Sequence, residues 1–181
     1  GDHVVLSWVP PCGECRYCRA GHEARCQKVA TVVAPLGVLF DGTSRLSRDG
    51  EQLHHYLGVS SFAEEVVVPA SGAVKVRDDA PLDVIAVVGC AVATGVGAVL
   101  NTAAVEPGST VAVIGCGGVG LNVVQGARLA GAERIVAIDV RPEKTQMALQ
   151  FGATDRIDAS QGDAVAQLRE VAPQHRRELA L

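Results

Sequence analysis

Four cysteines lie within fifteen residues near the start of the chain, in the stretch PPCGECRYCRAGHEARC (residues 10–26). Cys12, Cys15, Cys18 and Cys26 form the pattern C-x2-C-x2-C-x7-C. Sulfur at this density serves disulfides, an iron–sulfur cluster or a zinc ion. The stretch is too irregular for a long helix and too short to bury a core, so cross-links or a metal must hold it.

Zinc is the favoured partner of these cysteines. No cationic start with a long apolar run opens the chain, so an oxidising compartment and disulfides are not expected. Bacterial ferredoxins place their fourth cysteine after three residues and before a proline, whereas here the gap is seven and Gln27 follows. Four thiolates around zinc form a closed site that folds a coreless loop. An iron–sulfur cluster, and unligated or disulfide-bonded cysteines, stay open as alternatives. The net charge of −2 on such a centre would be offset by Arg16, Arg19, Arg25 and Lys28.

A glycine-rich turn, TVAVIGCGGVGLNVV (residues 110–124), carries a second chemical signal. Gly115, Gly117 and Gly120 form G-x-G-x-x-G between an apolar strand and a helix. The first glycine permits the tight turn, the second lets a pyrophosphate approach the backbone, and the third lets the helix pack closely on the strand. Helix-start N–H groups favour the anion. The pattern predicts a dinucleotide site that also includes Gly118 and Val119.

Asp139 ends the next apolar strand, nineteen residues after Gly120, where a carboxylate is expected to bind the adenosine ribose. It would repel a 2′-phosphate, which favours NAD over NADP. Arg141 would weaken that preference. Lys144 is placed to reach the same ribose, with a solvated surface lysine as the alternative. An ordinary glycine-rich turn in another α/β protein is the alternative for the whole motif.

The elements that must position these residues differ between the two halves of the chain. Residues 1–88 are predicted to be mostly β, with a strand over 3–9, a loop with one hairpin over 36–58, and a strand–turn–strand over 62–76. A small, apolar, helix-like segment follows from residue 82, interrupted around Gly89. Strands and helices then alternate, which indicates a parallel α/β sheet. The strands are 110–114, 134–139 and 155–158, and the helices are 121–132, 142–151 and 163–171.

Composition limits the classes of partner. The 181 residues are 48% hydrophobic but only 3% aromatic, so the core must consist of small aliphatic side chains. The net charge is −4 and no basic stretch stands out, which argues against nucleic acid and anionic membranes. The longest apolar runs contain glycine or fall short of a membrane span. A reducing, cytoplasmic location is expected.

The motifs together resemble the zinc-containing medium-chain alcohol dehydrogenases. The cysteine cluster, DGTSR, HHYLG, GCAVATGVGAVLNTA and GCGGVG…D occur in that order, and the resemblance covers residues 1 to about 162. It implies an α/β protein in which residues 1–90 are part of a GroES-like catalytic domain with a structural zinc lobe. Residues 91–181 would be the truncated first half of an NAD-binding Rossmann domain, making the chain an internal fragment.

The same resemblance implies hydride transfer between a primary or secondary alcohol and NAD, with a structural and a catalytic zinc. Cys90 would be the last of three catalytic-zinc ligands, and Thr94 would contact the nicotinamide. Trp8, Tyr56 and Leu57 match substrate-pocket positions. The other two zinc ligands would precede Gly1, so negligible turnover is expected from this chain alone. A small alcohol or aldehyde is the expected partner, and the full-length protein is expected to form a homodimer or homotetramer.

Two departures from the family pattern bear on activity. The subgroup that oxidises the glutathione adduct of formaldehyde carries an arginine four residues after the last zinc-lobe cysteine, where this chain has Ala30. A glutathione- or other thiol-dependent formaldehyde dehydrogenase is therefore the alternative, as is an inactive, truncated zinc-binding product. The tail APQHRRELAL (172–181) does not resemble the continuation into the second half of the Rossmann fold.

Overall fold

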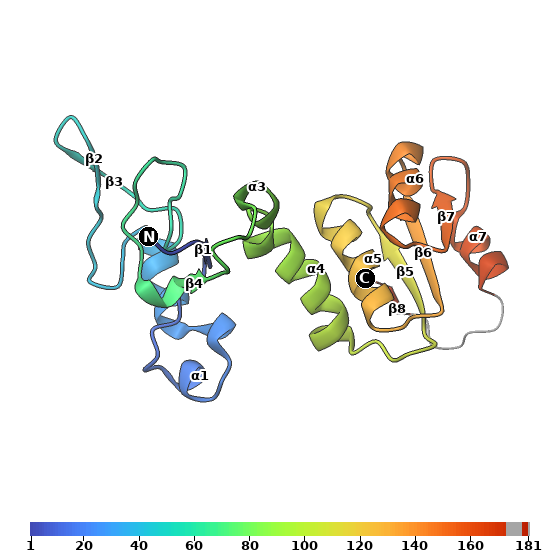
Figure 1. The fold of residues 1–181 in the computed structure, drawn as a ribbon, viewed down its shortest axis with the longest axis horizontal. Coiled ribbons are helices and arrows are strands. Elements are labelled where there is room, and N and C mark those ends of the chain that lie inside the picture. Colours follow the sequence, from blue (N-terminus) through green and yellow to red (C-terminus); the bar gives the residue numbers. More distant parts are fainter. Residues whose placement is uncertain (173–178, 181) are drawn as a thin grey trace. The chain divides into compact units, whose positions relative to one another are not determined.

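The computed structural model describes residues 1–172 and the backbone of 179–180. The chain divides into two compact units, Gly1–Gly89 and Cys90–Leu181 (Figure 1). The first carries the cysteine cluster, and the second carries the glycine-rich turn.

The first unit contains little regular β structure. Strand β1 (Val4–Leu6) pairs antiparallel with β4 (Ala73–Lys75), and β2 (Leu46–Arg48) pairs with β3 (Glu51–Leu53). This hairpin confirms the one expected within 36–58. The strand expected after residue 62 is wrong, because residues 62–69 form no strand and the Phe62 side chain is fully exposed. Three-residue strands also leave the unit mostly loop rather than mostly β.

Short helical turns surround the cysteines. They are α1 (Arg16–Arg19), the 3₁₀-helix η1 (Glu23–Arg25), the π-helix η2 (Val29–Val33) and α2 (Ala34–Leu36), with a further 3₁₀-helix η3 (Ala70–Gly72). Val29 and Val33 are buried against Cys18 and Cys26 in a small core. The helix at 29–36 was not predicted, although these two valines are spaced one turn apart.

A continuous helix runs through Leu82–Ala103. It comprises α3 (Leu82–Ile85), the π-helix η4 (Val88–Val92), α4 (Ala93–Gly97) and the π-helix η5 (Ala98–Ala103). The break expected at Gly89 is wrong. A Cβ on Gly89 would stand 2.8 Å from the Leu6 carbonyl oxygen, so this glycine serves close packing rather than helix termination.

This helix also corrects the expectation about apolar length. Its 22 residues have a mean hydropathy of 2.1, which by length and composition alone is enough to cross a membrane. From the sequence, glycines were expected to limit the apolar runs. The glycines of this helix do not interrupt it.

The second unit is a parallel sheet with the strand order β7-β6-β5-β8. Its strands are β5 (Thr110–Ile114), β6 (Arg134–Asp139), β7 (Asp155–Asp158) and β8 (Leu179–Ala180), and its helices are α5 (Gly118–Leu129), α6 (Pro142–Phe151) and α7 (Ala164–Val171). The alternation of strands and helices is confirmed. In the tail, β8 pairs parallel with β5, whereas 173–178 and 181 lie outside the described residues.

Both faces of this sheet are covered. Val111, Val113 and Ile135 pack with residues of α5 and α6 on one face. Ala112 and Val136 face the other way, toward partly buried residues of α7. Successive residues of a strand point to opposite faces, so a strand buried on both sides must be a continuous apolar run. That is why TVAVI and RIVAI are recognisable in the sequence.

Candidate metal and dinucleotide sites

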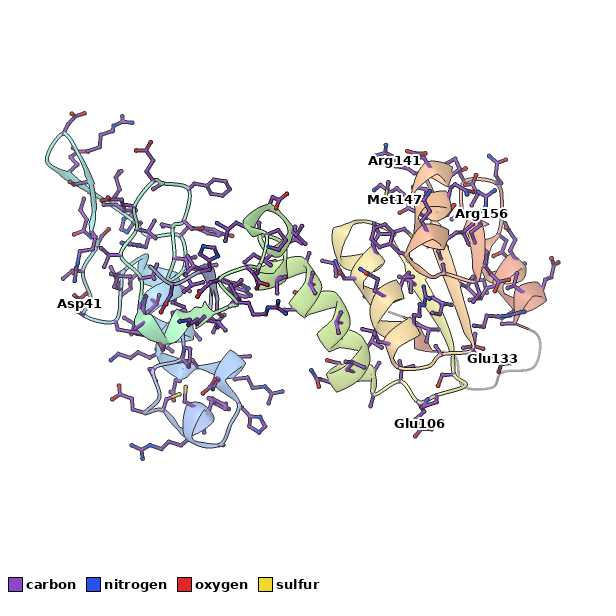
Figure 2. The ribbon with its side chains drawn as sticks, viewed as in Figure 1. Asp41, Glu106, Glu133, Arg141, Met147 and Arg156 are labelled. Atoms are coloured by element: carbon purple, nitrogen blue, oxygen red, sulfur yellow. The ribbon has the colours of Figure 1, made fainter. Side chains whose placement is uncertain are left out.

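The four cysteine sulfurs converge in the first unit. The Sγ atoms of Cys12, Cys15, Cys18 and Cys26 all lie within 4.8 Å of one another, with 4.0 Å between Cys12 and Cys18 and 3.5 Å between Cys15 and Cys18. Figure 2 shows sulfur atoms gathered beside α1. Zn–S bonds of about 2.3 Å in a tetrahedron place sulfurs roughly 3.8 Å apart. The cluster therefore has the size that zinc requires.

Backbone amides stabilise charge on these sulfurs. The amides of Cys12, Cys15 and Gln27 donate to the Sγ atoms of Cys26, Cys12 and Cys15 at 3.4, 3.4 and 3.5 Å. Amides of Cys18 and Gln27 lower the pKa of the Cys15 thiol to about 6, whereas burial raises the pKa of Cys18 to about 12. Without a cation the four thiols cannot all ionise together. A divalent metal supplies that cation, so the donor set fits zinc.

The glycine-rich turn has the shape that its sequence predicts. Gly115 has φ 91°, a left-handed conformation that favours glycine. A Cβ on Gly120 would stand 1.8 Å from the Gly115 carbonyl oxygen, so no other residue fits there. A Cβ on Gly117, which precedes α5, would have no heavy atom within 4 Å. The turn is thus closed beneath the helix and open where a pyrophosphate would approach.

Asp139 connects the end of β6 to this turn. Its Oδ2 accepts the Cys116 amide at 2.8 Å, and its Oδ1 accepts the Arg141 amide at 3.0 Å. Burial alone would raise the pKa of Asp139, but these two amides and the charges of Lys144 and Arg141 lower it overall. The carboxylate is therefore ionised at neutral pH and keeps lone pairs for further donors.

Two neighbours of Asp139 have other partners. The Arg141 side chain donates from Nε to Glu143 Oε1 at 2.7 Å, and Figure 2 shows Arg141 at the outer end of α6. Cys116, to which the sequence assigned no role, is buried with its Sγ 3.7 Å from the Ile138 carbonyl oxygen. Burial and the Asp139 charge raise the pKa of this thiol, so it acts as a small packing residue.

Cys90 and Thr94 are both exposed on the long helix, four residues apart. Within residues 1–172, the cysteine cluster is the one group of three or more possible metal ligands. Cys90 therefore belongs to no such group in the described part of the chain. The three residues expected to line a substrate pocket do not all lie in one hollow. Trp8 and Leu57 line a hollow of about 540 Å³ in the first unit, whereas Tyr56 is not among its lining residues and is 78% exposed.

Comparison with known protein families shows which family this chain is related to. Residues 1–78 match the alcohol dehydrogenase GroES-like domain, and residues 118–176 match the zinc-binding dehydrogenase family. The chain belongs to the zinc-containing medium-chain alcohol dehydrogenases. The predicted fold class is confirmed as a GroES-like region with a structural four-cysteine zinc site, followed by the start of a Rossmann-like parallel sheet.

Curated relatives within the dehydrogenase family include enzymes named for glutathione adducts. The chain is 46% identical over 158 residues to the class-3 alcohol dehydrogenase of Drosophila melanogaster, and 49% identical over 160 residues to a probable S-(hydroxymethyl)glutathione dehydrogenase of Schizosaccharomyces pombe. These alignments cover 87% and 88% of this chain but 41% and 42% of the relatives. The chain thus spans about two fifths of their length.

Solved structures of dehydrogenases agree with the fold. An alcohol dehydrogenase zinc-binding domain protein from Burkholderia ambifaria superposes with a TM-score of 0.87 at 39% identity. Benzyl alcohol dehydrogenase from Acinetobacter calcoaceticus superposes with 0.78 at 34% identity. Both superpositions cover 96% of this chain and 47% and 46% of the respective structures.

Proposed function

We propose that this protein is a zinc-dependent dehydrogenase that transfers hydride from an alcohol to NAD. The Asp139 carboxylate beside an open glycine-rich turn carries the proposal, because this pair suits a ribose and a pyrophosphate. When bound, a catalytic zinc would polarise the alcohol oxygen and NAD would accept the hydride. A soluble, cytoplasmic enzyme acting on a small alcohol agrees with the family.

The residues of the second unit would bind and orient the cofactor. Amides at the start of α5 would hold the pyrophosphate, and Asp139 would accept the ribose hydroxyls. Because the Arg141 guanidinium is paired with Glu143, it is not directed at a 2′-phosphate, which supports NAD over NADP. Lys144 lies close enough to influence the Asp139 charge and would contact the same ribose. We also propose Cys90 as a ligand of the catalytic zinc and Thr94 as a contact of the nicotinamide.

For the substrate, the relatives favour a hydroxymethyl thiol adduct over a simple alcohol. Several curated relatives at 46–49% identity are named S-(hydroxymethyl)glutathione dehydrogenases. The hollow lined by Trp8 and Leu57 also contains Arg25, a cation that suits a glutathione carboxylate. We therefore propose S-(hydroxymethyl)glutathione or a related thiol adduct as the substrate.

An uncharged primary alcohol is the second candidate, and one observation favours it. Ala30 lines the same hollow, where an apolar side chain offers a carboxylate no partner. Aromatic and aliphatic neighbours, Trp8, Val29 and Leu57, would suit an aromatic alcohol instead.

Trp8, the one tryptophan of the chain, reports on this hollow directly. Titration of the zinc-loaded protein with S-methylglutathione and with benzyl alcohol should change its fluorescence saturably for the preferred class. We expect S-methylglutathione to bind the more tightly, and Arg25→Ala to remove that advantage. Tighter binding of benzyl alcohol, unchanged in Arg25→Ala, would instead establish the second candidate.

A further inference from the structure

The helix that carries Thr94 touches the glycine-rich turn itself through Gly95. A Cβ on Gly95 would stand 2.6 Å from the Val119 carbonyl oxygen, 2.6 Å from Asn122 Cβ and 2.8 Å from the Val123 amide nitrogen. Two of these three atoms are backbone, and all belong to the first half of α5. Val119 is also a member of the G-x-G-x-x-G turn, so α4 and the turn are in direct van der Waals contact at Gly95.

Asn122 extends this contact to the turn. Its Nδ2 donates to the Gly118 carbonyl oxygen at 2.8 Å, and its Oδ1 accepts from Gln125 Nε2 at 3.0 Å. Gly118 is the first residue of α5 and follows Gly117. Displacement of Asn122 would therefore move the Gly118 carbonyl group. The amides next to it are those that would face the pyrophosphate.

A second glycine provides an internal comparison. Gly126, further along α5, also packs on the long helix, and a Cβ there would stand 3.1 Å from Val96 Cα and 3.2 Å from Val99 Cγ2. This contact lies one to two helical turns beyond the glycine-rich turn. The same two helices thus meet at two glycines, of which Gly95 alone contacts a residue of the turn among the residues described.

We infer that Gly95 is a positioning residue whose close contact with Val119 and Asn122 holds the dinucleotide-binding turn in shape. The inference rests on the proposed function, since it assumes that the turn binds NAD. A side chain at position 95 would have to displace the α5 backbone, because a carbonyl oxygen and an amide nitrogen cannot rotate away as a flexible side chain can. The displacement would fall on the amides that face the pyrophosphate.

The test compares Gly95→Ala with the control Gly126→Ala in the zinc-loaded chain, using calorimetric titration with NADH and the melting temperature Tm. Gly95→Ala should lower Tm, because all three atoms that its methyl group would meet lie closer than 3.0 Å, and Gly126→Ala, with contacts at 3.1–3.3 Å, should change Tm less. Only Gly95→Ala should weaken NADH binding, by about tenfold. In the absence of NADH, Gly95→Ala should shift the amide resonances of Gly117 and Gly118 more than Gly126→Ala does.

The outcomes are distinguishable. Unchanged NADH affinity in Gly95→Ala, or an equal loss in Gly126→Ala, would overturn the positioning role while leaving NAD binding intact. Absence of NADH binding by the unmodified chain would overturn the proposed function, and this inference with it. If Gly95→Ala does not fold, Asn122→Ala replaces it, because it adds no atom to the helix contact and removes only the side-chain bonds to Gly118 and Gln125. Weaker NADH binding in that variant supports the inference, and unchanged binding overturns it.

Discussion

At the scale of single residues, Asp139 is the side chain whose environment bears most directly on cofactor choice. It is ionised because two backbone amides donate to it, and one of these amides belongs to the glycine-rich turn. The sequence predicted its place at the end of a strand. The hydrogen bond to the Cys116 amide was not predictable, because it depends on how closely the turn folds back on β6.

Asp139→Asn should reduce the preference for NADH over NADPH by about tenfold. The amide side chain is nearly isosteric, but it no longer repels a 2′-phosphate. Titrations with both cofactors measure the ratio of the two affinities. Glu133→Gln serves as the charge-matched control, because Glu133 is exposed and precedes the opposite end of β6 from Asp139. An unchanged ratio in Asp139→Asn would argue against the ribose role.

His55 is a second residue whose state the sequence did not reveal. It lies in the loop that follows β3, and the residue is only 5% exposed. Its Nε2 accepts the Arg45 amide at 3.2 Å, and its own amide donates to the Gly37 carbonyl oxygen at 2.7 Å. Burial, and then the Arg45 guanidinium, lower the pKa of His55 from its usual 6.5. The folded protein therefore holds this imidazole neutral.

This burial predicts a pH dependence of stability. Because the folded-state pKa is the lower one, the unfolded chain binds more protons, so the free energy of unfolding falls as pH drops below 6.5. Above that pH the contribution is constant. Denaturant unfolding of the zinc-loaded protein from pH 7.5 to 5.5 should show this decline, with a shallower slope in His55→Gln. Identical slopes in the two proteins would contradict the assignment.

At the scale of elements, the zinc lobe and the sheet differ in how far sequence alone specifies them. The strands β5 and β6 were predicted within a residue because burial on both faces requires an unbroken apolar run. The cysteine spacing likewise predicted a shared site. The expected strand after residue 62 and the break at Gly89 failed because both depend on tertiary partners. Without a neighbouring strand no ladder forms, and Gly89 is explained by the Leu6 carbonyl.

Removal of one cysteine should abolish metal binding by the lobe. Cys18→Ser should lower the zinc content from one ion per chain to near zero, because a three-thiolate site lacks the closed tetrahedron. Elemental analysis by mass spectrometry measures this. Cys116→Ser is the matched control, since Cys116 is also buried but lies outside the cluster, and it should retain zinc. Iron with visible absorption in the unmodified protein would instead identify an iron–sulfur cluster.

At the scale of the whole molecule, the two units depend on different sources of stability. The first unit has a small core centred on cysteines and two valines, whereas the second has a sheet with apolar residues buried on both faces. Removal of only one source of stability should therefore unfold only the unit that depends on it.

Chelation of zinc should release amide protection in residues 10–40 while leaving β5, β6 and β7 protected. Metal-bound and chelator-treated protein would be compared by hydrogen exchange with mass spectrometry. The strands serve as the internal control, because no sulfur of the cluster contributes to their core. Equal loss of protection in both units would show that zinc supports the entire chain rather than its own lobe.

The most direct test of the account is a calorimetric titration of the zinc-loaded protein with NADH, followed by one with NADPH. The open turn at Gly117 and the ionised Asp139 predict saturable binding of one NADH per chain, with weaker binding of NADPH. Binding of neither cofactor, or tighter binding of NADPH, would contradict the assignment of this protein as an NAD-dependent dehydrogenase.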